Sequence, residues 1–329
     1  MATARRRQTR SRRDASRRTL RRGQSCGRRV AAGIAAGATD LELAAFTDER
    51  APDVVRLVNA TIEGWPYCRP IDAELVAHWK TLGGAYQPAN MLLAYCGGTA
   101  RAFLHGERYG ATHGIRFLAL TPGAIAEGLR LVGEVERRAW AERVERIIGP
   151  TCNSGKFYAG YVLGLEPYHP HWAVDGTEVF VRAGFSVTQN ECILVAAPAA
   201  ATPPGRPPAG YEIIEAQTPP EFLARPFKYA AVFDGKEVAT CAARLYPKLM
   251  SPSGGPIGQV GYVGTDKAHR GKGLATLMTE MCLKRLFEWG AGEALISTGL
   301  DNPAALRAYE KAGFRRRHSV TEWTKVLIG

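Results

Sequence analysis

A proline-rich segment at residues 197–209, APAAATPPGRPPA, divides the chain into two parts that repeat one order of secondary-structure elements. Its five prolines and its lack of a bulky hydrophobic residue are typical of a semi-rigid linker between domains. The segment VFVRAGF (179–185) has the same place in the first part as AYEKAGF (308–314) has in the second. An internal duplication is the simplest account of this repetition.

The hydrophobic periodicity predicts strands and helices interleaved around a mixed sheet in both parts. In the N-terminal part the patterns predict strands at 41–46, 91–96, 100–109, 114–120 and 191–197, and helices at 51–65, 72–82, 125–147 and up to about 185. In the C-terminal part they predict strands at 211–215, 228–233, 236–246, 257–265, 294–298 and 317–327, and helices at 273–289 and from 302 onward.

The positive charge of the chain is concentrated at its N-terminus. Residues 1–30 hold twelve Arg and one Asp, which accounts for most of the formal net charge of +12. This segment has no apolar periodicity, so we expect residues 1–39 to be disordered. Arg-rich starts also occur in nucleic-acid or membrane-surface arms and in targeting peptides, or arise from a start codon assigned too early. Nucleic acid is therefore a candidate partner only through this tail.

The rest of the composition is typical of a globular protein in a reducing compartment. Hydrophobic residues make up 46% and charged residues 22%, and no apolar run approaches the roughly 20 residues that span a bilayer. The seven Cys are odd in number and form no C-x-x-C pair, so we expect reduced thiols and a cytoplasmic location. His169 and His171 lie close together without a third ligand at metal-binding spacing, so no metal is expected.

The segment VGTDKAHRGKGLATLM (263–278) carries the strongest functional signal. It places a glycine-rich turn between a strand end and a helix start, where backbone N–H groups and the helix dipole favour an anion. Gly271 and Gly273 let phosphate oxygens approach the backbone, and Arg270 and Lys272 add positive charge. The order of residues fits neither a Walker loop nor a G-x-G-x-x-G turn. The segment predicts a pyrophosphate site, with an ordinary strand-helix connection as the alternative.

Two motifs of the C-terminal part resemble the signatures of the GNAT acetyltransferase superfamily. The coenzyme signature [QR]-x-x-G-x-[GA] is matched by residues 270–275, and N-x-A-A-x-x-x-Y-x-x-x-G-F is matched by residues 302–314. Both motifs occur in the expected order within the expected strand-helix pattern. The resemblance implies an α/β (α+β) protein with two tandem GNAT-fold domains, at 40–196 and 210–329, each a mixed, mostly antiparallel sheet flanked by helices.

The resemblance also implies roles for individual residues, with acetyl-CoA as the acetyl donor. Asn302 would contact the coenzyme. Tyr309 would protonate the departing thiolate, which suits a weakly acidic phenol, or it would only pack in an amphipathic helix. The residues implied to hold the pantetheine arm in a gap between two splayed strands, and to polarise the thioester, are Val263, Gly264 and Thr265. The residues implied to bind the pyrophosphate are Arg270, Gly271, Lys272, Gly273, Leu274, Ala275 and Thr276.

The resemblance breaks down at the general base. Family members with a carboxylate on the strand before Asn302 use it to deprotonate the amine, but this strand carries Ser297 and Thr298. Asp266 and His269 are the nearest ionisable residues in the sequence, and Asp266 is equally suited to cap the turn. A water relay to a group from the other domain is a further alternative.

The N-terminal part lacks the residues of the donor site. Its turn, PGAIAEGLR, carries Ile125 and Glu127 at the positions of the two basic rim residues, so its charge opposes a pyrophosphate. Phe180 stands at the position of the phenol. The sequence therefore predicts one working site per chain, with the first domain structural or shaping the acceptor pocket.

The C-terminal part lacks a different element. Only about a dozen residues separate its first two strands, so the two helices that normally cover the acceptor side of a GNAT domain are nearly absent. We expect the N-terminal domain, whose equivalent helices are present, to pack there and close the pocket.

These observations predict an N-acetyltransferase that moves an acetyl group from acetyl-CoA to a primary amine of a small molecule. The missing carboxylate leaves open a sensor or structural module that binds acyl-CoA without turnover. A third alternative is an acetyltransferase that acts on a protein partner.

Overall fold

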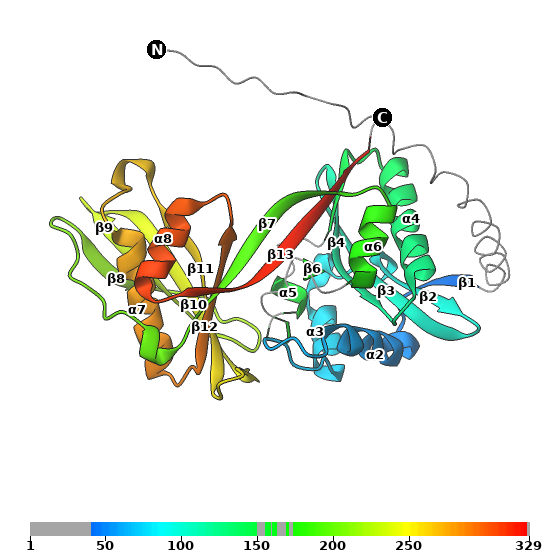
Figure 1. Cartoon of the computed structure of the whole chain (residues 1–329), viewed down its shortest axis with the longest axis horizontal. Coiled ribbons are helices and arrows are strands. Elements are labelled where there is room, and N and C mark those ends of the chain that lie inside the picture. Colours follow the sequence, from blue (N-terminus) through cyan, green and yellow to red (C-terminus); the bar gives the residue numbers. More distant parts are fainter. Residues whose placement is uncertain (1–40, 150–154, 159, 163–168, 171–173, 328–329) are drawn as a thin grey trace, which may run out of the picture. The chain divides into compact units, whose positions relative to one another are not determined.

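The computed structural model describes residues 41–327, apart from 150–154, 159, 163–168 and 171–173. We call residues 41–196 the N-terminal half and residues 197–327 the C-terminal half. The predicted tail at 1–39 lies outside the described residues. The helices and strands of both halves are labelled in Figure 1.

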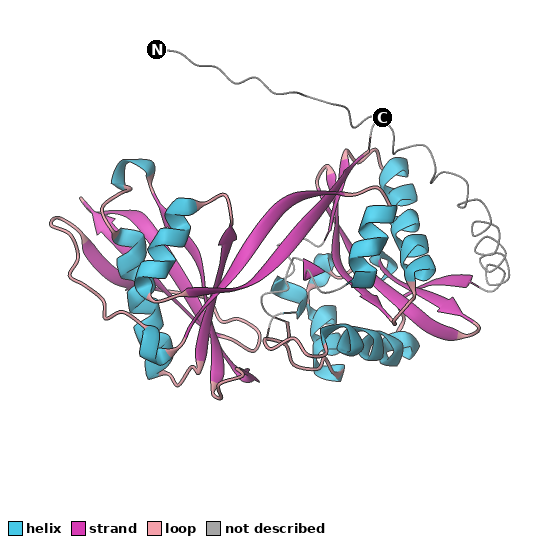
Figure 2. Cartoon of the chain, viewed as in Figure 1, coloured by secondary structure: helices cyan, strands magenta, loops and turns pink. Residues whose placement is uncertain are grey.

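The N-terminal half is a sheet with helices on both faces (Figure 2). Buried residues of its second strand alternate between two clusters, with Met91 and Leu93 packed under one helix pair and Leu92 and Ala94 under the other. The first helix pair is α2 (Ala51–Ile62) and α3 (Ala73–Thr81), and the second is α4 (Ile125–Ala141) and α6 (Val174–Arg182). The strands are β1 (Leu41–Ala45), β2 (Met91–Cys96), β3 (Thr99–Tyr109), β4 (Thr112–Leu120), β5 (Arg146–Gly149) and β7 (Ser186–Ala196). The short elements are α5 (Gly155–Tyr158) and β6 (His169–Pro170).

The C-terminal half repeats this order with helices on one face only. Its larger cluster joins the sheet to α7 (Leu274–Glu288) and α8 (Pro303–Ala312). On the other face, Trp65 and Tyr67 of the N-terminal half pack against Leu295 and Val195. The strands are β8 (Glu212–Ala216), β9 (Arg225–Phe233), β10 (Lys236–Met250), β11 (Pro256–Thr265), β12 (Glu293–Gly299) and β13 (Arg315–Val326).

The two halves exchange their last strands. The sheet order is β1-β2-β3-β4-β5-β13-β7-β12-β11-β10-β9-β8, so β13 pairs with β5 of the N-terminal half and β7 pairs with β12 of the C-terminal half. The two exchanged strands also pair with each other, from Arg315↔Val195 to Thr324↔Ser186. Each half contains one parallel pair, β4 with β5 and β11 with β12. The pairs within β2–β3–β4 and within β8–β9–β10–β11 are antiparallel. One continuous sheet therefore runs through both halves.

The structure corrects one predicted element and confirms one predicted contact. The helix predicted at 125–147 is wrong at its end, because α4 stops at Ala141 and Ile147 pairs with Lys325 in the sheet. Residues 217–224, between β8 and β9, contain no helix, as the sequence indicated. Phe222 of this segment stacks on His78 of α3, with ring centroids 3.6 Å apart. The predicted packing of the N-terminal half against this segment is thereby confirmed.

The strand exchange predicts that neither half folds alone. A fragment of residues 197–329 lacks β5 and β7, which leaves β13 without a strand partner on either side and one side of β12 unpaired. We expect this fragment to be insoluble or unfolded by circular dichroism, and the intact chain to unfold in one calorimetric transition. Co-expression with residues 1–196 should restore a soluble complex. A stable, monomeric fragment with native circular dichroism would contradict the exchange.

Candidate functional site

The glycine-rich turn between β11 and α7 exposes a row of backbone N–H groups. Gly271 and Gly273 have φ angles of 78° and 81°, and a Cβ built on either residue would meet nothing within 4 Å. Among the described residues, no protein acceptor receives a hydrogen bond from the backbone N–H groups of 271–276. The first helical bond of α7 runs from the Leu277 N–H to the Gly273 carbonyl. Unpaired donors facing open space at a helix N-terminus form an anion site.

The basic rim of the turn is held by contacts that the sequence did not reveal. Arg270 Nε donates to the Thr265 carbonyl at 3.0 Å. Lys272 Nζ lies 5.3 Å from the ring centroid of Tyr211 and 5.8 Å from that of Phe233, within the range of cation–π attraction. The two rings fix the Lys272 ammonium beside the turn without neutralising its charge.

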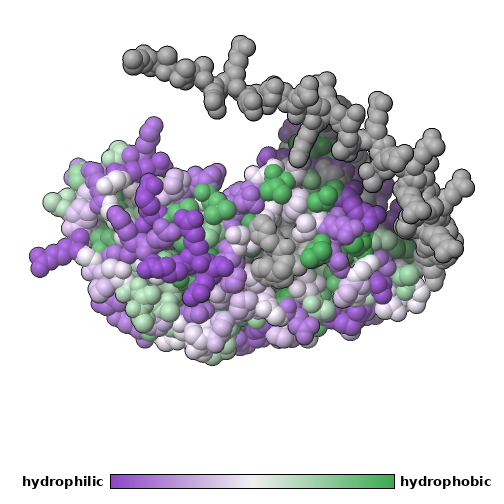
Figure 3. All heavy atoms as spheres, viewed as in Figure 1, coloured by the Kyte–Doolittle hydropathy of each residue, from purple (hydrophilic) through white to green (hydrophobic). Residues whose placement is uncertain are grey.

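Exposed positive side chains continue over the helix that carries Tyr309. Hydrophilic residues gather over α8 and β13 on the visible face of the C-terminal half in Figure 3. Such a field attracts a polyanion to the surface. The exposed basic residues of these two elements are Arg307, Lys311, Arg315, Arg316 and Arg317.

The strands beside the turn diverge where the resemblance places the pantetheine arm. Pairing between β11 and β12 covers only Ile257–Gln259 and Glu293–Leu295. On its other edge β11 shifts register against β10 near Tyr262, whose φ is 49°. The backbone of 263–265 consequently borders a gap between two strands, with Val263, Gly264 and Thr265 half-buried. The gap itself is as expected, whereas the role of these residues stays a prediction.

Tyr309 and Asn302 lie on α8, next to this gap. The Tyr309 side chain is 6% exposed and packs in the cluster beneath α7, which also contains Leu274. Burial and then the charges of Cys241 and Glu191 raise the pKa of Tyr309 to about 12, so the phenol keeps its proton at neutral pH. Asn302 Oδ1 accepts the Ala305 N–H at 3.2 Å and caps α8.

The residues proposed as alternative bases do not meet at the gap. The Asp266 side chain is exposed and makes no capping hydrogen bond. His269 Nδ1 lies 2.7 Å from the Tyr211 hydroxyl, beneath the basic rim. On β12, Ser297 is exposed and Thr298 is buried. None of the side chains that the sequence suggested is therefore identified as the general base.

In the N-terminal half, the protein's own carboxylates occupy the equivalent anion position. The Gly123 N–H, in the turn before α4, donates to Asp175 Oδ2 at 2.8 Å. Glu127 is buried in the first turn of α4, with Oε1 3.8 Å from Arg101 Nε. A second anion at this helix end would meet two negative charges.

The strand gap of the N-terminal half is also filled. A Cβ on Gly149 of β5 would lie 2.9 Å from Ile115 Cβ and 3.2 Å from the Phe180 ring, so these side chains close the space between β4 and β5. Phe180 is fully buried and stacks on Trp323 with centroids 6.1 Å apart. Within the described residues of this half, neither the turn nor the strand gap is open as it is in the C-terminal half.

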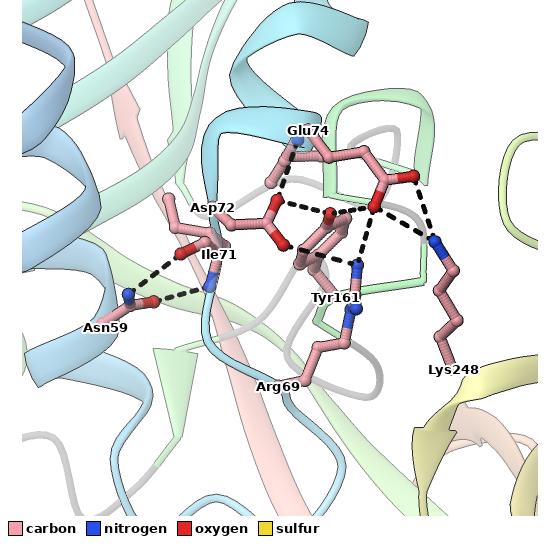
Figure 4. A network of polar contacts seen from close by, with 8 residues as sticks. Asn59, Arg69, Ile71, Asp72, Glu74, Tyr161 and Lys248 are labelled. Carbon is pink, nitrogen blue, oxygen red and sulfur yellow. Dashed lines mark hydrogen bonds and ion pairs between the residues drawn. The ribbon is translucent and has the colours of Figure 1, made fainter.

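A polar network links the two halves (Figure 4). Lys248 Nζ of β10 binds both carboxylate oxygens of Glu74 in α3, at 3.1 and 3.2 Å. Tyr161 donates to Asp72 Oδ1 at 2.7 Å, and the guanidinium of Arg69 lies 3.7 Å from the Tyr161 ring centroid. These contacts hold the start of α3 near residues 217–224, the segment of the C-terminal half that contains no helix.

Other features of the described residues lie apart from this site. An open pocket of about 450 Å³ is lined by Arg225, Arg285 and Trp289 at the far end of α7 from the turn. No group of three possible metal ligands occurs among the described side chains, which include neither His169 nor His171. Every helix of the described chain is too short or too polar to cross a membrane. Cys241 and Cys282 are free thiols.

Comparisons with known proteins place these features in context. Residues 195–314 match the model of the acetyltransferase (GNAT) family. A mycothiol acetyltransferase of Catenulispora acidiphila is 43% identical over 63 residues, which is 19% of this chain and 20% of that relative. The matched segment thus spans about a fifth of the relative's length.

Two solved structures resemble the whole described fold. A GCN5-related N-acetyltransferase from Sphaerobacter thermophilus has a TM-score of 0.62 at 17% identity, covering 87% of this chain and 95% of that one. A tandem GNAT protein from the clavulanic acid biosynthesis pathway has a TM-score of 0.63 at 15% identity, covering 87% and 98%. The predicted fold class of two tandem GNAT-fold domains is confirmed.

Proposed function

Because this chain belongs to the GNAT acetyltransferase family through residues 195–314, we propose that it transfers an acetyl group from acetyl-CoA to a primary amine at one site in its C-terminal half. The observation that carries the proposal is the combination of an open N–H turn, a strand gap and a buried phenol in that half. In the described residues of the N-terminal half, Asp175 binds the turn, Ile115 fills the gap and Phe180 stands in place of the phenol. The reduced thiols support a cytoplasmic setting.

Each part of this arrangement suits one task in acetyl transfer. The N–H groups of 271–276 and the charges of Arg270 and Lys272 would bind the pyrophosphate of acetyl-CoA. Backbone groups of 263–265 would hold the pantetheine arm and donate to the thioester oxygen. When bound, acetyl-CoA supplies the electrophilic thioester carbon. The Tyr309 hydroxyl would give its proton to the sulfur as the C–S bond breaks.

A small-molecule amine is the acceptor that the interface between the halves favours. Phe222, Trp65 and Tyr67 close the sheet face that lacks its own helices, which leaves less room for an extended polypeptide. The relatives named mycothiol acetyltransferase, matched over short segments, support an acceptor of this class.

A second candidate function is a module that binds acyl-CoA without turnover. The absence of a carboxylate on β12 beside the gap, within the described residues, favours it. An acceptor on a protein partner is the remaining alternative.

A thiol-release assay tests the proposal. Purified protein with acetyl-CoA is mixed with a panel of amino sugars, amino acids, polyamines and a short peptide, and free coenzyme A is measured against a sample without amine. We expect release with a subset of small amines. Tight acetyl-CoA binding without release for any amine would establish the binding module, and release with the peptide alone would establish a protein acceptor.

A further inference from the structure

The strand exchange brings a carboxylate of the N-terminal half to the end of β12. Glu191 of β7 is the antiparallel partner of Gly299, the last residue of β12. The gap between β11 and β12 lies on the other side of the same strand end, beyond the paired residues Glu293–Leu295. Gly299 has no side chain, and the carboxylate of Asp301, from the turn after β12, lies in the space that its Cβ would take.

Side chains along β7 alternate between the two faces of the sheet, which places Glu191 on the face opposite α8. Cys192 and Leu194 pack in the cluster beneath α7 and α8, whereas Ile193 and Val195 pack in the cluster on the other face. Glu191 follows the second set, since side chains two residues apart share a face. Its carboxylate and the Tyr309 phenol therefore approach the gap from opposite faces of the sheet.

The Glu191 carboxylate is half-buried and held in place. Gln189 Nε2 donates to Glu191 Oε1 at 3.0 Å. Ionisable groups of three neighbouring elements lie near it. From β13, Glu322 has a pKa raised by burial and by the charge of Glu191. From the turn after β12, Asp301 fills the space that a side chain on Gly299 would take. From α8, Tyr309 has a pKa that the Glu191 charge also raises.

We propose that Glu191, supplied by the N-terminal half, is the general base for acetyl transfer at the C-terminal site. The inference rests on the proposed function. Glu191 takes a proton, directly or through one water, from the ammonium form of the bound substrate. The freed nitrogen lone pair then forms the N–C bond at the thioester carbon and the C–S bond breaks. The sulfur receives the Tyr309 proton, and the nitrogen loses its second proton to solvent. Solvent then returns both side chains to their starting states.

This assignment accounts for the carboxylate that β12 lacks. The strand next to the gap carries Ser297 and Thr298 where a base is expected, and the strand paired with it carries the carboxylate instead. If the C-terminal half kept its own last strand next to β12, the residue at the position of Glu191 would come from that half. The base therefore crosses from one half to the other through backbone pairing alone.

The test compares Glu191→Gln with wild type across pH, using the best amine from the panel. At pH 7 we expect kcat/KM to fall about 100-fold, within the ~10² to 10⁴ range of general-base catalysis, with the Kd for acetyl-CoA unchanged. As the pH approaches the pKa of the free amine, more of the amine loses its proton to solvent without a base. The loss in kcat/KM of Glu191→Gln relative to wild type should then shrink below about 5-fold. A structural role of Glu191 would lower the rate equally at every pH.

Two matched carboxylate variants serve as controls. Glu322→Gln removes a neighbouring ionisable group on β13, and its loss in kcat/KM should stay well below the ~10²-fold expected for a general base. Asp301→Asn removes the carboxylate over Gly299 and should behave likewise. A large, pH-dependent loss in Asp301→Asn together with a normal Glu191→Gln would transfer the role to Asp301 and overturn the proposal.

Further readouts separate the possible failures. If wild type releases no coenzyme A with any amine, the proposed function fails and not this inference alone. If wild type is active and Glu191→Gln keeps its rate and pH profile, only the inference fails. Should Glu191→Gln melt at a lower temperature, Glu191→Ala is assayed with added formate. Recovery of the rate by formate supports the base, and no recovery overturns it.

Discussion

Replacing Gly271 by Glu abolishes acetyl-CoA binding, and isothermal titration of the wild type gives one site per chain. The new carboxylate would stand among the N–H groups of 271–276, where the pyrophosphate is expected. Placing like charges together costs several kcal/mol, so a loss of at least roughly 3 kcal/mol, or about 100-fold in Kd, is expected. Gly271→Ala introduces the same backbone strain at φ 78° without the charge, so its affinity for acetyl-CoA should fall much less.

The control for this prediction lies in the N-terminal half. Glu127→Gln and Asp175→Asn together remove the two carboxylates at the start of α4. We still expect one site, because Ile115 and Phe180 fill the strand gap regardless of charge. Two sites in this double variant, or two in the wild type, would show that the N-terminal half also binds the donor.

Replacing Tyr309 by Phe lowers kcat by about 100-fold or more, in the range of ~10² to 10⁴ for loss of a general acid. The Kd for acetyl-CoA and the melting temperature should stay near wild type, because the ring remains packed in the cluster beneath α7 and only the hydroxyl is lost. Stopped assays of thiol release at saturating substrates measure the effect. An unchanged kcat would leave Tyr309 as a packing residue, the alternative that its burial also suits.

The raised pKa of Tyr309 sets the expected pH dependence of the wild type. Only the protonated phenol can act as the acid, and burial raises its pKa to about 12. The acid therefore stays in its active form throughout neutral and moderately alkaline pH. We expect kcat to rise or level off between pH 7 and 10, as the amine loses its proton, without a decline due to Tyr309.

The sequence predicted the parts of the site that follow from local spacing. The glycines at 271 and 273 and the helix that follows them form a contiguous motif, and the structure shows the open turn that this motif predicts. Asn302 before Pro303 predicted a helix start, where it is the observed N-cap. Coenzyme contact by these residues, like the domain boundaries at 196 and 210, stays a prediction.

The sequence could not predict what depends on pairing between distant strands. Residues 186–196 and 315–326 have strand patterns that fit either half, so their exchange leaves no local signal. The helix end after Ala141 was missed because Val144 and Ile147 continue the apolar spacing into β5. Tyr211 and Phe233, which hold Lys272, come from strands far from the turn. The position of Glu191 was hidden for the same reason.

The exchanged strands also bear on how such a chain can change over generations. A duplicated domain that has lost its ligand is ordinarily free to drift or to be deleted. Here the N-terminal half supplies the strand that borders β12, and the C-terminal half supplies the strand that borders β5. Recombination cannot release either half as a separate gene without opening the shared sheet, so selection for a single reaction would maintain both halves.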